Sequence, residues 1–206
     1  MKRLILTLAI FINLISLFSQ DVRNVSWGMN IIDVQSSETL TIFKRLDANA
    51  NNTVLVYKDQ IFGDSIYVWY QFLYDSLSSV MYQYYRSSTM EESYDKMLRL
   101  VNLLTTKYSE PKEIIWNCKD PDIRNIVENA ENQNQELEYL FFAGDITGIS
   151  YKWVTDRSFI SLVISSENLN VQGRNFIFPA FSIIYKSHNY DRLLQMSQNE
   201  YLQNKF

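Results

Sequence analysis

The sequence predicts an α+β fold: an antiparallel sheet built from two groups of strands, with helices packed on one face. The first observation is that strand-like segments occur in two groups separated by helical segments. The links inside each group are short enough for hairpins, which favours antiparallel pairing over a doubly wound parallel sheet. The second observation is composition: 47% of the 206 residues are hydrophobic and only 20% are charged, which is typical of a packed core.

The first group of elements is a capped helix followed by three strands. Asn30 suits the N-cap of a helix over residues 30–38, because Asp33 lies three positions further on, as in a capping box. Gly63-Asp64 and Asp75-Ser76 suit turns. Segments rich in β-branched and aromatic residues around these turns predict an antiparallel meander of strands at residues 53–59, 65–73 and 77–85.

Two helical segments and a short strand follow. Thr89 and Glu92 match a capping box, and apolar residues then recur at helical spacing until Pro111. A short strand is predicted around Trp116. Asp120-Pro121 then supplies a cap and a first-turn proline for an apolar helical stripe that ends near Gly144.

The second group of strands is predicted at residues 149–155, 159–165 and 176–186, with a polar loop at 167–175. Pro179 indicates that the last strand lies at a sheet edge or carries a bulge. A final amphipathic helix over residues 189–203, with Tyr190, Leu193, Leu194 and Tyr201 inward, either packs on the sheet or projects from it.

The first twenty residues have the order of a secretory signal peptide. Lys2 and Arg3 precede an apolar run over residues 4–18, which leads into Ser19 and Gln20. As a helix this run would measure roughly 22 Å, short of the roughly 30 Å of a bilayer core. We therefore expect residues 1–20 to be cleaved and residues 21–206 to form one exported domain in the periplasm or the extracellular space, with no membrane span.

The common catalytic and cofactor signatures are missing. His188 is the only histidine, which argues against Ser-His-Asp and multi-histidine zinc sites, and Cys118 is the only cysteine, so no intramolecular disulfide forms. The net charge of −4 argues against nucleic acid as a partner. We expect no cofactor, no metal and no catalytic motif, although carboxylate-based catalysis stays open.

Residues 47–52 begin like a calcium-binding loop, because Asp47, Asn49 and Asn51 place oxygen ligands at alternate positions. The twelfth position of such a loop would be Lys58, where a bidentate glutamate is needed. The segment is therefore interpreted as a flexible polar connection.

Three motifs resemble a known group of proteins. They are the opening at residues 23–34, which contains Trp27-Gly28-Met29 before the capped helix, the helix end at residues 107–111, and the hairpin that starts at Trp153. In these motifs the chain resembles uncharacterised exported bacterial proteins. The resemblance implies a helix-plus-sheet module similar to the β-lactamase-inhibitor-protein fold and to the small outer-membrane lipoprotein of the barrel-assembly machinery, both of which act by binding proteins. The chain lacks the lipidated cysteine of the second.

Alternation within the meander separates two faces, because side chains two positions apart share a face of a strand. One face is apolar and is expected to meet the helices: Ile66, Val68, Tyr70, Phe72, Val80, Tyr82 and Tyr84. The other face mixes rings and amides, as protein-binding surfaces do: Tyr67, Trp69, Gln71, Met81, Gln83 and Tyr85. The alternative is that the C-terminal helix or the second strand group covers this second face.

These patterns predict an exported, non-enzymatic protein-binding module whose partner is another envelope protein, with Tyr67, Trp69 and Tyr85 as anchors. A small-molecule or lipid carrier with an aromatic pocket between sheet and helices is the alternative function.

Overall fold

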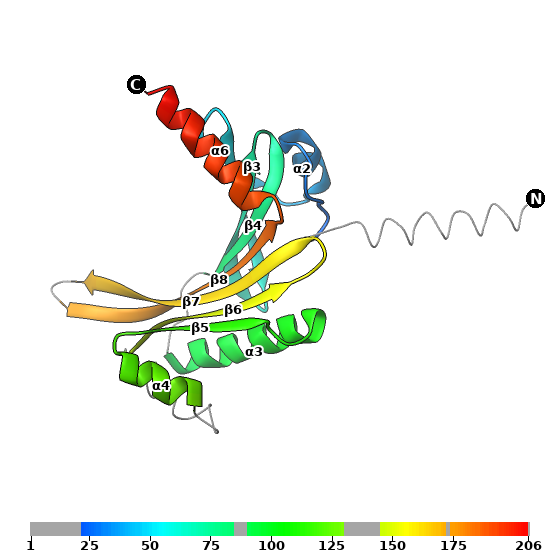
Figure 1. Ribbon diagram of the computed structural model, residues 1–206. Helices are drawn as coiled ribbons and strands as arrows, with labels where there is room; N and C mark the ends of the chain where they lie inside the picture. The colour runs from blue at the N-terminus through cyan, green and yellow to red at the C-terminus, as the bar shows by residue number, and fades with distance from the viewer. Residues whose placement is uncertain (1–21, 85–89, 130–144, 172–173, 206) are drawn as a thin grey trace, which may run out of the picture.

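A computed structural model describes residues 22–84, 90–129, 145–171 and 174–205. Within these ranges the chain forms an eight-stranded antiparallel sheet in the order β1-β2-β3-β4-β8-β7-β6-β5 (Figure 1). The strands are β1 (Ile42–Asn49), β2 (Asn52–Ile61), β3 (Asp64–Leu73), β4 (Ser76–Tyr84), β5 (Glu113–Cys118), β6 (Ile146–Val154), β7 (Ser158–Val171) and β8 (Arg174–Ser187). The helices are α2 (Ile31–Ser37), α3 (Met90–Tyr108), α4 (Pro121–Asn129) and α6 (Tyr190–Gln203). The α+β class with an antiparallel sheet is confirmed.

The two predicted groups of strands join at the centre of the sheet. β8, the last strand in the chain, pairs with β4 from Ser79–Lys186 to Gln83–Ser182 and with β7 along its whole length. A long-range strand pairing therefore connects the meander β1–β4 to the strands β5–β7.

Hydrogen bonds from Trp27 and Gly28 connect the N-terminal segment to both groups of strands. Trp27 Nε1 donates to Ser158 Oγ on β7 at 2.9 Å, and the Gly28 N–H donates to the carbonyl of Leu77 on β4 at 3.1 Å. Gly28 has φ +89°, a conformation that glycine adopts without steric cost. The next element, α2, begins as predicted, because Asn30 Oδ1 accepts from the Asp33 N–H.

The core lies on one face of the sheet, which we call the inner face. The seven residues predicted for this face are 0–7% exposed: Ile66, Val68, Tyr70, Phe72, Val80, Tyr82 and Tyr84. Val34 of α2 and Leu100 and Leu104 of α3 belong to the same buried cluster. Trp153 of β6 completes it and donates from Nε1 to the Ser109 carbonyl at 2.9 Å.

The C-terminal helix lies on the opposite side of the meander from α2 (Figure 1). It contacts β3 on what we call the outer face, through a hydrogen bond from the Tyr190 hydroxyl to Gln71. The prediction that Tyr201 points inward is wrong, since this residue is 46% exposed. The other residues predicted to point inward, Tyr190, Leu193 and Leu194, are half-buried, and α6 also buries Ser197, whose hydroxyl donates to Asn49 Oδ1.

The sequence missed β1, part of which was interpreted as a polar connection. This strand lies at the edge of the sheet and most of its residues are exposed, so its side chains do not alternate between apolar and polar. Asp47 belongs to β1, where its carboxylate accepts hydrogen bonds from Thr53 Oγ1 at 2.8 Å and from Arg45 Nε at 3.1 Å. These hydrogen bonds lower the pKa of Asp47.

The predicted loop at residues 167–175 is also wrong, because β7 and β8 continue as a long hairpin with pairs from Ser166–Pro179 to Val171–Arg174. This arm extends beyond the rest of the sheet in Figure 1. Residues 167–175 were interpreted as a loop because most of them are polar, although Leu169 and Val171 alternate with asparagines as in a strand. The prediction that Pro179 places the last strand at a sheet edge or at a bulge is wrong, because β8 lies between β4 and β7 and its described pairs show no register shift. Pro179 itself lies beyond the last described pair of β8 with β4, where it has no N–H to donate to that strand.

The signal peptide at residues 1–20 and the cap residue Thr89 lie outside the described residues. The second half of the helical stripe that begins at Pro121, residues 130–144, also lies outside them.

Candidate functional site

The outer face of β3 and β4 gathers the residues singled out from the sequence. Trp69 pairs with Met81, and Tyr67 pairs with Gln83, so these four side chains form a compact group next to Gln71. All five residues are half-buried. The sixth, Tyr85, lies outside the described residues.

One end of this group is covered by α6. The Tyr190 hydroxyl donates to Gln71 Oε1 at 3.0 Å, and Gln71 Nε2 donates to Asn52 Oδ1 at 3.1 Å. Further along the helix, Glu200 accepts from Asn51 Nδ2. Gln71 therefore holds the C-terminal helix in place and is not available to a partner.

The centre of the group is Trp69. Its Nε1 atom is buried and has no hydrogen-bond partner among the described residues. Its strand neighbour Val56 is 2% exposed. Because its polar atom faces no solvent, Trp69 forms the floor of the face and is a weaker candidate for a protruding anchor than the sequence suggested.

The other end of the group is open. Phe43 of β1 is 51% exposed, and its ring centroid lies 5.4 Å from that of Tyr67. Lys58 Nζ lies 4.0 Å from the Phe43 centroid, a cation–π contact. We call Phe43, Lys58 and Tyr67 the open patch.

Next to the open patch lies a hollow of about 690 Å³. Its described lining residues come from the paired strands β2 and β3. Lys58, Gln60, Ser65 and Tyr67 share the outer face, whereas Asp59 and Ile66 alternate to the inner face. Sequence reasoning missed Phe43 because β1 was not predicted, and it left Lys58 out because this residue of the predicted strand 53–59 gains its significance only from its contact with Phe43. The apolar pair Ile42-Phe43 ahead of the charged Lys44 and Arg45 is the signal that could have found it.

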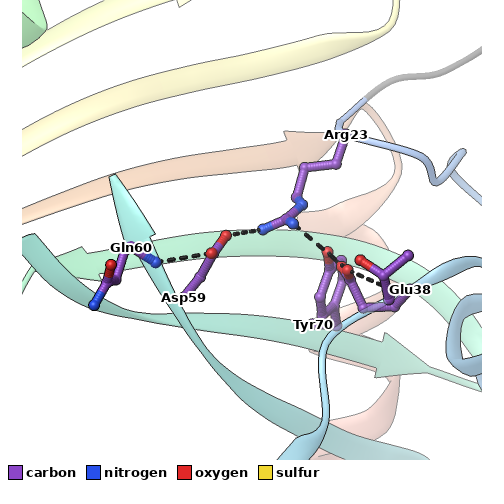
Figure 2. Close-up of polar contacts among 6 residues, drawn as sticks. Arg23, Glu38, Asp59, Gln60 and Tyr70 are labelled. Carbon is purple, nitrogen blue, oxygen red and sulfur yellow. Dashed lines mark hydrogen bonds and ion pairs between the residues drawn. The ribbon is translucent and has the colours of Figure 1, made fainter. Parts of the chain in front are cut away.

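A second polar feature lies at the inner face (Figure 2). Arg23 lies between two carboxylates, with Nη1 2.5 Å from Asp59 Oδ2 and Nη2 3.5 Å from Glu38 Oε1. The Tyr70 hydroxyl donates to Glu38, whose side chain is only 2% exposed. Burial, followed by this hydrogen bond to a carboxylate, raises the pKa of Tyr70 far above its ordinary value. Tyr70 therefore remains a hydrogen-bond donor, and in this cluster a single guanidinium serves two carboxylates.

Arg23 and Asp59 also border a cleft of about 340 Å³ between the inner face and α3. Its other lining residues are mainly apolar or aromatic: Ile61, Tyr82, Tyr84, Leu103, Leu104, Lys107, Ile183 and Tyr185. Burial raises the pKa of Tyr82, Tyr84 and Tyr185, so these phenols, neutral at neutral pH like any tyrosine, stay neutral to higher pH than an exposed tyrosine.

The described residues offer no group of three or more histidine, cysteine or acidic side chains placed to hold a metal ion. His188 is exposed; its Nε2 lies 3.1 Å from the Thr155 carbonyl and its ring lies 4.7 Å from that of Phe159. Among the described helices, none combines the length and the apolar character needed to cross a membrane.

Comparisons with protein-family models, curated proteins and solved structures found no match.

Proposed function

We propose that this protein is an exported, non-enzymatic binding module that holds another protein of the envelope through the open patch on its outer face. The observation that carries the proposal is the coincidence of the hollow of about 690 Å³ with the uncovered end of the face. Since α6 covers the Gln71 end, a partner would approach at Tyr67.

The chemistry of the open patch favours a polypeptide partner. Exposed aromatic rings bury a large area on association and lose little side-chain entropy, which makes them frequent anchors of interfaces. Phe62, in the β2–β3 turn, adds a further ring that is 64% exposed. Lys58 contacts rings and has no carboxylate partner among the described residues, so an acidic side chain of the partner would complement it.

The test starts with a photo-crosslinking residue placed at position 67 in cells that make the protein, to capture and identify the partner. Affinity of the purified pair is then measured for Tyr67→Ala, Phe43→Ser and Tyr201→Ala. The last is a matched control, because Tyr201 is a similarly exposed ring on the distant part of α6. Thermal unfolding of each variant verifies that it is folded.

We expect Tyr67→Ala and Phe43→Ser each to weaken binding by about tenfold or more, the effect of truncating an anchor residue, and Tyr201→Ala to change little. Equal affinity for wild type and both patch variants would refute the assignment. Loss of binding with Tyr201→Ala alone would place the interface on α6 instead.

A further inference from the structure

We infer that the cleft between α3 and the inner face binds a single-chain amphiphile with one negative charge, an alkyl carboxylate. The cleft lies on the other side of the sheet from the open patch, since Tyr82 and Tyr84 alternate with Met81 and Gln83 along β4. This inference goes beyond the proposed function and does not depend on it.

The size and the walls of the cleft suit a small apolar body. A volume of about 340 Å³ lies within the range of roughly 300–1,000 Å³ that is usual for ligand sites. Leu103 and Leu104 of α3 face Tyr82, Tyr185 and Ile183 of the sheet across it. Leu103 is 46% exposed, so an apolar chain that entered the cleft would cover it.

The charges at the cleft determine the sign of the ligand. Asp59 lines the cleft and shares the single Arg23 guanidinium with Glu38, which is not among the lining residues. Lys107 has no carboxylate partner among the described residues, and its Nζ lies 5.0 Å from the centroid of the Tyr108 ring. A cation without a counterion at the edge of an apolar cleft favours an anionic end group, and one lysine matches one negative charge.

Tyr84 supplies a second argument for a ligand with polar atoms. It is 5% exposed and lines the cleft, and its buried hydroxyl has no hydrogen-bond partner among the described residues. A buried hydroxyl without a partner is costly, because it loses its hydrogen bonds to water without replacement. A ligand oxygen that displaces the side chains now covering this hydroxyl would accept a hydrogen bond from the phenol, which is neutral and therefore a donor.

The probes are decanoate and decanol, which share a chain and differ in charge, titrated into the full chain by calorimetry below the micellar concentration. We expect saturable binding of one decanoate per chain. Lys107→Gln should weaken decanoate by about threefold, the size of a partly exposed ion pair, and leave decanol unchanged. Tyr84→Phe, which removes only the hydroxyl, should weaken decanoate as well.

Tyr67→Ala separates this inference from the proposed function, since it alters the open patch and should leave decanoate binding unchanged. The absence of saturable decanoate binding would overturn the inference. So would an equal effect of Lys107→Gln on decanoate and decanol, or loss of decanoate binding in Tyr67→Ala. Each variant is compared with wild type by thermal unfolding, and the exposed Lys107 is expected to be replaced without loss of stability.

Discussion

Replacing Arg23 by glutamine removes the only described cation that contacts Glu38 and leaves the buried carboxylate uncompensated. The side chain of Glu38 is 2% exposed, so water cannot take the place of the guanidinium. Breaking a buried ion pair by removing one partner typically costs about 3–5 kcal/mol, because the remaining charge loses solvation without regaining an interaction.

For Arg23→Gln we expect a cost near the lower end of this range, because both carboxylates keep other hydrogen bonds. Glu38 keeps the hydrogen bond from the Tyr70 hydroxyl and another from the Thr39 N–H at 3.0 Å. Asp59, whose side chain is 23% exposed, keeps the Gln60 N–H and gains contact with water. We therefore expect Arg23→Gln to lower the free energy of unfolding by about 3 kcal/mol. For a domain of this size this corresponds to a melting temperature roughly 6–12 °C lower.

Urea unfolding followed by circular dichroism measures this loss, with linear extrapolation to water. The double variant Arg23→Gln/Glu38→Gln is the control: it removes the buried charge as well, so it should be more stable than Arg23→Gln alone. A loss below about 1 kcal/mol for Arg23→Gln, or a double variant less stable than the single one, would refute the argument from burial.

Two further predictions concern packing and pH. Gly148→Ala places a Cβ 3.0 Å from the Ile164 carbonyl, which the β6–β7 ladder holds in position, so urea unfolding should show a loss of about 1–3 kcal/mol; an unchanged midpoint would contradict this. Burial raises the pKa of Tyr82, Tyr84 and Tyr185, so the unfolded chain loses these protons first. The free energy of unfolding that these tyrosines contribute is therefore fully present below about pH 10 and should fall above it, by about 1.4 kcal/mol per pH unit for each tyrosine. Tyr84→Phe should make this fall with pH less steep. If the free energy of unfolding falls equally steeply with pH in Tyr84→Phe and in wild type, Tyr84 does not contribute to the pH dependence.

Local features of the fold could be predicted because the interacting groups are close in sequence. Asn30 caps α2 through Asp33, three residues away, and Gly63 adopts φ +85° at the turn between β2 and β3. The meander followed from the same logic, since its strands alternate between a buried and a half-exposed face. β1 escaped prediction because it has one neighbouring strand and most of its side chains are exposed, and residues 167–175 of the β7–β8 hairpin escaped prediction because most of them are polar.

The candidate site was predicted only in part. Alternation along β3 and β4 placed Tyr67, Trp69, Gln71, Met81 and Gln83 on one face, as the structure has them. It carried no information on which of them a helix would cover, because the contact of Gln71 with Tyr190 joins positions 119 residues apart.

By itself the sequence determined the α+β class, the apolar inner face and the caps and turns, because these depend on side-chain periodicity and on neighbours within a few residues. Only the tertiary structure decided which surfaces stay open. The pairing of β1 with β2 brings Phe43 to Tyr67, and Arg23 reaches Asp59, 36 residues further along the chain. The cleft between α3 and the inner face forms because α3 packs opposite Ile183 and Tyr185 of β8. Each of these contacts depends on strand register and helix placement, which are set by the burial of the whole core and not by any local segment.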